Sequence, residues 1–144
     1  MKKIIPHFLT TLLCLAPVLA QAQREVSPNP EADTIQWHYG DIQNIVLSEK
    51  INISGHFISY GSQSLVWFQD GIDRTYRFDV TGVDGKWTDA GRDGGLVYRA
   101  TCLEVDGTIR ISRRRKALRI ELDFVKPDKR TPHLSFDVDT YSKM

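Results

Sequence analysis

The sequence predicts an all-β protein with a single antiparallel meander of about eight strands, closed as a small barrel or folded as a sandwich. Two observations predict this fold class. Apolar and polar residues alternate with a period of two over much of the chain beyond residue 34, as in strands with one buried and one solvent-facing side. Short turn signals, several of them Asp-Gly pairs, separate the alternating runs, and such turns join antiparallel neighbours.

The strand candidates follow one another closely along the chain. The clearest alternation covers residues 76–80, 118–124 and 134–138, with Phe78, Ile120 and Phe136 on the apolar sides. Weaker strand patterns cover 35–39, 51–60, 65–68, 96–105 and 108–112. With short connections between all of them, each strand is expected to pair with the next along the chain.

Three connections need separate comment. Asp106-Gly107 has the composition of a two-residue hairpin turn, because both residues tolerate positive φ. Residues 113–117 are predicted to form the turn between strands 108–112 and 118–124. The segment 41–46 fits either a short helix, with Asp41 as its N-cap, or a strand.

The N-terminus has the pattern of a secretory signal peptide over residues 1–22. Lys2 and Lys3 precede an apolar run at 8–19, and Ala20-Gln21-Ala22 provides small residues for cleavage. The run is too short to favour a retained membrane anchor. We therefore expect a periplasmic or secreted protein. Residues 23–33 are polar and contain Pro28 and Pro30, which predicts a flexible tether before a single β domain at 34–144.

Cleavage of the signal peptide changes the net charge and the number of cysteines. The full chain has 19 Lys and Arg against 18 Asp and Glu. Loss of Lys2 and Lys3 leaves 17 against 18, a net charge of −1, and loss of Cys14 leaves Cys102 as the one thiol. An internal disulfide is then excluded. The near-neutral balance disfavours nucleic acid as a partner.

Aromatic residues suggest a binding function for the barrel. Trp67, Trp87 and Tyr98 are candidates to line a pocket for a small apolar or sugar-like ligand. The competing interpretation is that these rings form the core. Trp87 lies between strands, among polar and glycine residues, which predicts either a capped barrel end or a binding loop.

A basic cluster suggests a second function. Arg113, Arg114, Arg115 and Lys116 are candidates for docking on an anionic surface of the cell envelope. The competing interpretation is a solvated hairpin, in which Arg110 and Arg119 pair across the strands with Glu121 and Asp123.

Catalysis and cofactor binding find no support in the sequence. Common nucleophile, phosphate-binding and zinc-protease motifs are absent from it. His38, His56 and His133 are spread one to a segment, without the spacing of a metal pair. We therefore expect a non-catalytic binding module, with an envelope-associated interaction protein as the alternative. An integral outer-membrane barrel competes with both, but charged residues opposite the apolar faces disfavour it.

Two short segments resemble known small barrels. The ending Asp139-Thr140-Tyr141-Ser142-Lys143-Met144 is similar to the last strand of avidin-type biotin binders. Gly85-Lys86-Trp87 has the Gly-x-Trp form seen in lipocalins. These likenesses imply a lipocalin-like or avidin-like architecture, and they carry no ligand or site residues to this chain.

Overall fold

The computed structural model describes residues 26–124 and 133–144, and these residues form strands and turns without any helix. The prediction of an all-β protein is confirmed. The strands are β1 (Thr34–Asn44), β2 (Glu49–Ile51), β3 (Gly55–Tyr60), β4 (Ser64–Gln69), β5 (Thr75–Asp84), β6 (Gly94–Cys102), β7 (Val105–Arg114), β8 (Ala117–Phe124) and β9 (His133–Lys143).

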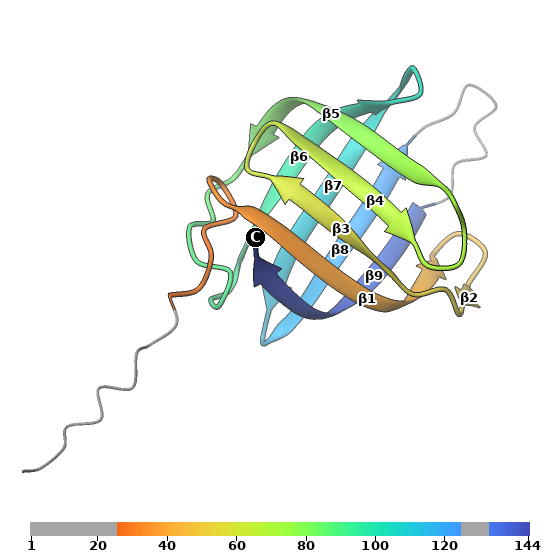
Figure 1. Ribbon diagram of the computed structural model, residues 1–144, viewed down its shortest axis with the longest axis horizontal. Helices are drawn as coiled ribbons and strands as arrows, with labels where there is room; N and C mark the ends of the chain where they lie inside the picture. Colours follow the sequence, from red (N-terminus) through yellow and green to blue (C-terminus); the bar gives the residue numbers. More distant parts are fainter. Residues whose placement is uncertain (1–25, 125–132) are drawn as a thin grey trace, which may run out of the picture.

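The sheet closes into a barrel (Figure 1). From β3 onward each strand pairs antiparallel with the next, and β9 returns to pair with β1, which makes eight strands in a closed ring. The short β2 is the extra strand, paired with the end of β1. Of the two architectures that the sequence allowed, the structure is therefore the barrel rather than the sandwich.

Residues 41–44 continue β1 and residues 45–46 begin a turn, so the strand interpretation is right for most of the segment 41–46 and the helical one is wrong. Ile42 pairs with Phe136 of β9 as well as with Ile51 of β2. β1 ends at Asn44, whose side-chain oxygen accepts hydrogen bonds from the backbone N–H groups of Val46 and Leu47, both at 3.1 Å. Pairing on both edges outweighs the local helical pattern, because residues 42–44 find backbone partners on β2 and on β9.

The hairpin between β6 and β7 turns earlier than predicted. Leu103 and Glu104 form the turn, with φ of 49° and 64°, whereas Asp106-Gly107 lies inside β7. Gly107 is opposite Ala100 and Phe124. A turn at Asp106-Gly107 would shift the register and place Arg113 and Arg115 opposite Ala100 and Tyr98. Arginines would then face the apolar interior, and that cost exceeds the benefit of the better turn residues.

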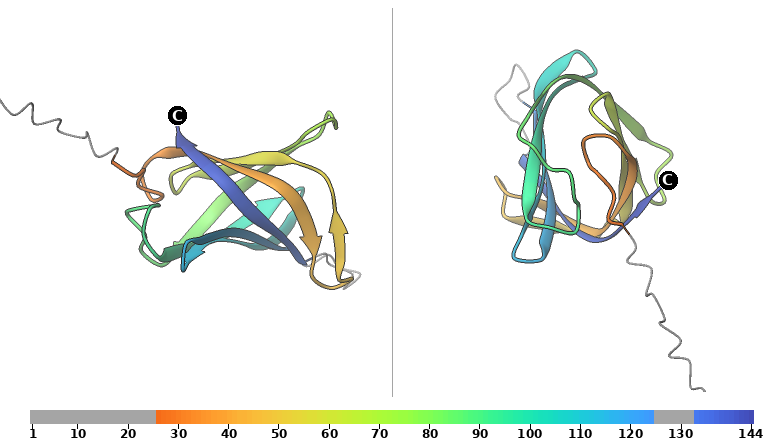
Figure 2. Two further views of the ribbon diagram at one scale, coloured as in Figure 1. Left: turned by 90° about the horizontal axis from the view of Figure 1, so that it is seen from below. Right: turned by 90° about the vertical axis from the view of Figure 1, so that its left-hand side faces the viewer.

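The N-terminal segment corrects the predicted tether and domain boundary. Pro28 and Pro30 are buried, and the carbonyl of Pro28 accepts a 2.9 Å hydrogen bond from the Ala90 amide. The Glu31 carboxylate accepts a hydrogen bond from the backbone N–H of Trp87. Figure 2 shows residues 26–33 and the 85–93 loop lying together across one end of the barrel. From Pro28 onward this segment is therefore part of the folded domain.

The barrel interior is filled by side chains. Alternate residues of every long strand point inward, and the largest of them, Trp37, Phe57, Tyr98 and Phe136, are fully buried. These rings and the aliphatic residues between them form one apolar cluster. Burial of this apolar surface is the main stabilising contribution to the fold.

Candidate functional site

Trp67, the first of the three candidate ligand-binding rings, is a core residue. Its side chain is 6% exposed, and its ring stacks on Phe57 with centroids 5.6 Å apart. Its indole Nε1–H donates a 2.7 Å hydrogen bond to the hydroxyl of Tyr39. The ring faces and the indole N–H of Trp67 already have partners within the protein, so Trp67 is part of the core.

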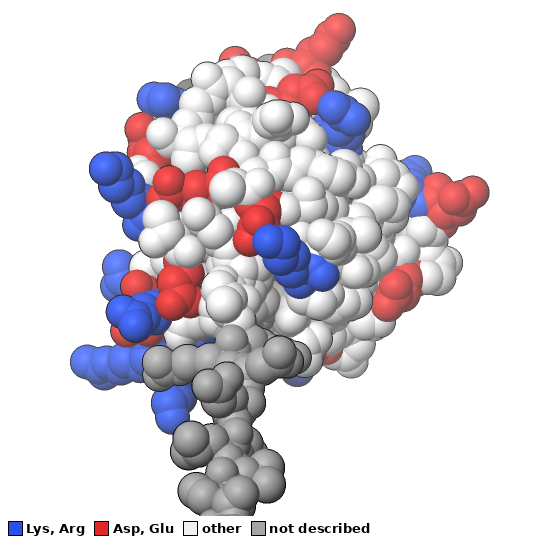
Figure 3. Space-filling view, turned by 60° about the vertical axis from the view of Figure 1, so that its left-hand side comes forward, with Lys and Arg blue, Asp and Glu red and all other residues white. Residues whose placement is uncertain are grey.

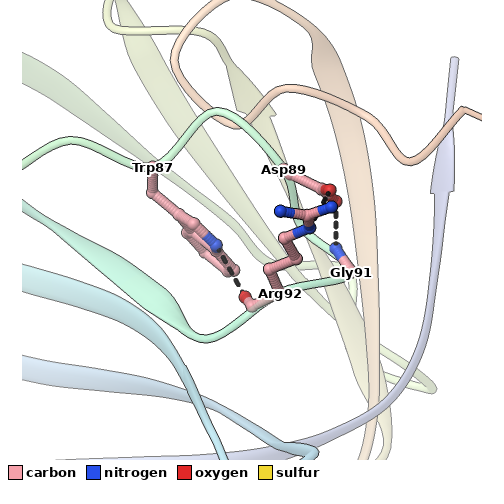
Figure 4. Close-up of polar contacts among 4 residues, drawn as sticks. All are labelled: Trp87, Asp89, Gly91 and Arg92. Atoms are coloured by element: carbon pink, nitrogen blue, oxygen red, sulfur yellow. Dashed lines mark hydrogen bonds and ion pairs between the residues drawn. The ribbon is translucent and has the colours of Figure 1, made fainter.

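Trp87 belongs to the 85–93 loop, which with residues 26–33 caps one end of the barrel, and Figure 4 shows the polar contacts within this loop. It stacks on Trp37 with centroids 6.1 Å apart, and its Nε1–H donates to the Arg92 carbonyl at 3.0 Å. The same loop is fixed by Asp89, whose carboxylate accepts from the Gly91 amide and pairs with Arg92 at 3.3 Å. Of the two interpretations of this loop, the structure shows the capped barrel end.

Tyr98 lies inside the barrel on β6 with no exposed surface. Its hydroxyl has no hydrogen-bond partner among the described residues, and burial raises its pKa. No ring contact between described residues joins Trp67, Trp87 or Tyr98 to one another. The structure therefore does not bring the three rings together as one site. It places each of them in the core.

The four basic residues proposed for docking are also separated. Arg113 points toward the interior end of the barrel, where its guanidinium lies 5.7 Å from the centre of the Tyr141 ring. Arg114 points outward, because side chains alternate along β7. Arg115 and Lys116 form the two-residue turn, with φ of 48° and 72°. The predicted turn is in the right place, but Arg113 and Arg114 belong to β7; these two residues line one depression, and Arg115 and Lys116 are not among its lining residues.

A different set of arginines does share a surface. Outward residues Arg110, Ser112 and Arg114 of β7 lie directly opposite Glu121, Arg119 and Ala117 of β8. These six residues line a shallow depression of about 350 Å³, which we call the basic groove. Diagonal neighbours across a strand pair are about 7–8 Å apart, within reach of arginine side chains. Arg110 and Arg114 therefore lie on either side of Ser112, with Arg119 opposite it on β8.

Small residues keep this surface hollow. A second depression of about 580 Å³ adjoins the basic groove and shares Arg110, Ser112 and Arg114 with it. Its opposite side is formed by Gly94 and Gly95 of β6. A Cβ added at Gly95 would lie 2.9 Å from the Cβ of Ser112. Glycine at this position therefore leaves room beside the arginines that a larger residue would fill.

The groove carries more positive charge than the described structure neutralises. Arg119 pairs with Asp137 of β9 at 3.0 Å, which corrects the expected pairing with Asp123. Arg110 lies opposite Glu121 but forms no ion pair with it, and Arg114 has no acidic partner within the described ranges. Glu121 instead lies 3.9 Å from His133. Arg110 and Arg114 are thus exposed cations available to an external anion.

Other surfaces are more evenly balanced. The face in Figure 3 shows acidic and basic side chains interspersed beside a broad uncharged area. A depression between β1 and β9 is lined by Asp41, Asp137 and Asp139, but Lys50 pairs with Asp41 at 2.8 Å and Arg119 with Asp137. This acidic depression is therefore largely neutralised by the protein itself.

Comparison of the chain with protein-family models, with curated proteins and with solved structures finds no match. Over residues 26–124 and 133–144, no helix has the length and apolar character needed to cross a membrane.

Cys102 is the remaining reactive side chain. It is half-buried near the end of β6, and burial, together with the negative charge of Asp79, raises the pKa of its thiol. The thiolate is the nucleophilic form. Cys102 is thus held in its unreactive state at neutral pH.

The sequence predicted one basic hairpin that includes Arg110, Arg114 and Arg119, but it did not distinguish these outward arginines from Arg113. The useful signal was the spacing of Arg110, Ser112 and Arg114, because residues two apart share one face of a strand. The predicted turn at 113–117 included Arg113 and Arg114, so the alternation of their side chains between the two faces of β7 was not recognised.

Proposed function

We propose that this is an exported, non-catalytic protein that docks on the cell envelope by binding phosphate-bearing lipid headgroups in its basic groove. The observation that carries the proposal is the pair of unneutralised arginines, Arg110 and Arg114, on either side of Ser112. The burial of Trp67, Trp87 and Tyr98 gives no support to a ligand inside the barrel.

The chemistry of the groove suits a phosphate. Guanidinium groups form bidentate, charge-assisted hydrogen bonds with phosphate oxygens, and a neighbouring hydroxyl adds a further donor. Basic residues near an anionic membrane each contribute about 1 kcal/mol of attraction, which falls as salt screens the charges. Two free arginines therefore support weak, reversible, salt-sensitive docking.

Vesicle sedimentation tests this docking. The protein is expected to sediment with phosphatidylglycerol vesicles at low salt, and to be released by about 300 mM salt. Phosphatidylcholine vesicles are not expected to retain it. Replacing both Arg110 and Arg114 with Ser should weaken binding by at least about tenfold.

The matched control removes the same charge elsewhere. Arg77 and Arg92 are exposed and already pair with Asp79 and Asp89. Replacing both with Ser should leave vesicle binding nearly unchanged. Equal loss of binding in the two double variants would show that only net charge matters, and the groove would not be the site.

Export is tested separately, because residues 1–22 lie outside the described residues. Expression of the full chain in a Gram-negative host should deliver a periplasmic form whose N-terminal residue is Gln23. A protein that kept Met1 and stayed with the cytoplasmic fraction would contradict the proposed localisation.

A further inference from the structure

Two histidines lie side by side on the outer face of the barrel, away from the basic groove. His38 of β1 is directly opposite His56 of β3, and their ring centroids are 5.6 Å apart. His56 is in turn opposite Phe68 of β4 and stacks on its ring, with centroids 4.7 Å apart. Their sequence neighbours Trp37 and Phe57 point inward, so both imidazoles face solvent.

The spacing of the two rings suits a shared metal ion. Imidazole nitrogens bind Zn²⁺ and similar ions at about 2.0–2.1 Å, so two rings on one ion have centroids about 5 to 6 Å apart. The observed separation lies in this range. Both residues belong to paired strands, and the stacking of His56 on Phe68 limits its rotation. Binding of an ion then costs little conformational entropy, because the two side chains are already partly ordered.

The ring nitrogens are also available. Within the described ranges, neither imidazole takes part in a hydrogen bond or an ion pair. Both side chains are only partly buried, so an ion can reach the ring nitrogens from solvent.

We propose that His38 and His56 together bind one divalent transition-metal ion, with Cu²⁺ bound more tightly than Zn²⁺. Imidazole ligands suit both ions, and the general order of stability places Cu²⁺ above Zn²⁺. No group of three or more metal-binding side chains occurs in the described part of the chain, so water completes the coordination. This pair could not be predicted from residue spacing, because the two histidines lie on different strands. The site is independent of the basic groove.

Titration of the purified, untagged protein with Cu²⁺ tests the proposal. Calorimetry should give one ion per chain, and electron paramagnetic resonance should show coupling to two imidazole nitrogens. His38→Ala and His56→Ala should each weaken Cu²⁺ binding at least tenfold and leave coupling to one imidazole. Tryptophan fluorescence of each variant checks that the barrel is folded, and His56→Gln serves as a second variant that keeps a side chain of similar size beside Phe68.

His133 provides the control, because it lies on β9 beside Glu121 and apart from the pair. His133→Ala should bind Cu²⁺ as the wild type does. The proposal is overturned if folded His38 and His56 variants keep wild-type affinity, or if the spectrum of the wild type shows a single imidazole. Equal loss of affinity in the His133 variant would overturn it as well.

Discussion

Replacing Tyr39 with Phe tests how the polar atoms inside the barrel contribute to stability. Tyr39 is 3% exposed, and its hydroxyl accepts a 2.7 Å hydrogen bond from the indole N–H of Trp67. The same hydroxyl donates to the backbone carbonyl of Phe68 at 3.3 Å. The substitution removes one oxygen atom while keeping the ring, so the change in packing is small.

The expected loss of stability follows from the two partners left behind. The N–H group of Trp67 remains buried without an acceptor, and leaving one buried group unsatisfied costs about 1–3 kcal/mol. The Phe68 carbonyl loses its longer and weaker bond, so we expect a total of about 2–3 kcal/mol. Urea unfolding followed by tryptophan fluorescence measures it. Tyr60→Phe is the control, because Tyr60 is 40% exposed, and it should change stability by less than about 0.5 kcal/mol.

The same variant makes a prediction about pH. Burial raises the pKa of Tyr39 from 10.0 to about 12. Below pH 10 the hydroxyl of Tyr39 is neutral in both states, and its contribution to the free energy of unfolding is fully present. As pH rises toward 12 this contribution is lost, because Tyr39 ionises at a lower pH in the unfolded chain than in the folded one. The wild type should therefore lose about 1 kcal/mol through Tyr39 by pH 11, while Tyr39→Phe does not. The stability difference between the two proteins should narrow accordingly.

Two results would refute this reasoning. A Tyr39→Phe protein within about 0.5 kcal/mol of the wild type near pH 7 would show that the hydroxyl is not needed to satisfy Trp67. A difference that stays constant between pH 8 and pH 11 would show that the pKa of Tyr39 is not raised in the folded state.

Three further predictions concern the turn, the cap and the thiol. Changing Leu103 to Asn together with Glu104 to Gly should stabilise the protein by about 1 kcal/mol in urea unfolding, because both positions have positive φ; no gain would contradict the turn geometry. Glu31→Ala should cost about 1 kcal/mol by removing the acceptor for the Trp87 amide, and an unchanged unfolding midpoint would argue against a fixed N-terminal segment. Cys102 should react with a thiol reagent much more slowly in the native protein than in urea near pH 8, whereas equal rates would contradict its burial.

The sequence was a reliable guide to strands and faces. Alternation around Phe78, Ile120 and Phe136 correctly predicted three strands and the side of each that is buried. The physical reason is local: side chains of successive strand residues point to opposite sides, so a period of two indicates one buried face whatever the neighbouring strands are.

The sequence was a poor guide to turns and to the N-terminal segment. Asp106-Gly107 has the composition of a hairpin turn, yet Leu103 and Glu104 form it. Pro28 lies in a polar, proline-containing segment typical of a linker, yet it is buried and its carbonyl accepts a hydrogen bond from the Ala90 amide. In both cases the local preference is worth about 1 kcal/mol or less, and burial of apolar surface along whole strands or across the barrel end outweighs it.

Local patterns in the sequence were enough to predict a β protein with strands in meander order and charged side chains facing outward. Closure of the ring by β9 on β1, the filling of the ring by aromatic side chains and the choice of neighbours among outward residues depend on contacts between distant parts of the chain. Alternation specifies the face of a residue, but the register between strands specifies its partner across the sheet. Register is set by the packing of all inward residues together. That is why the His38–His56 pair, and the position of Arg119 opposite Ser112 between Arg110 and Arg114, became visible only in the folded barrel.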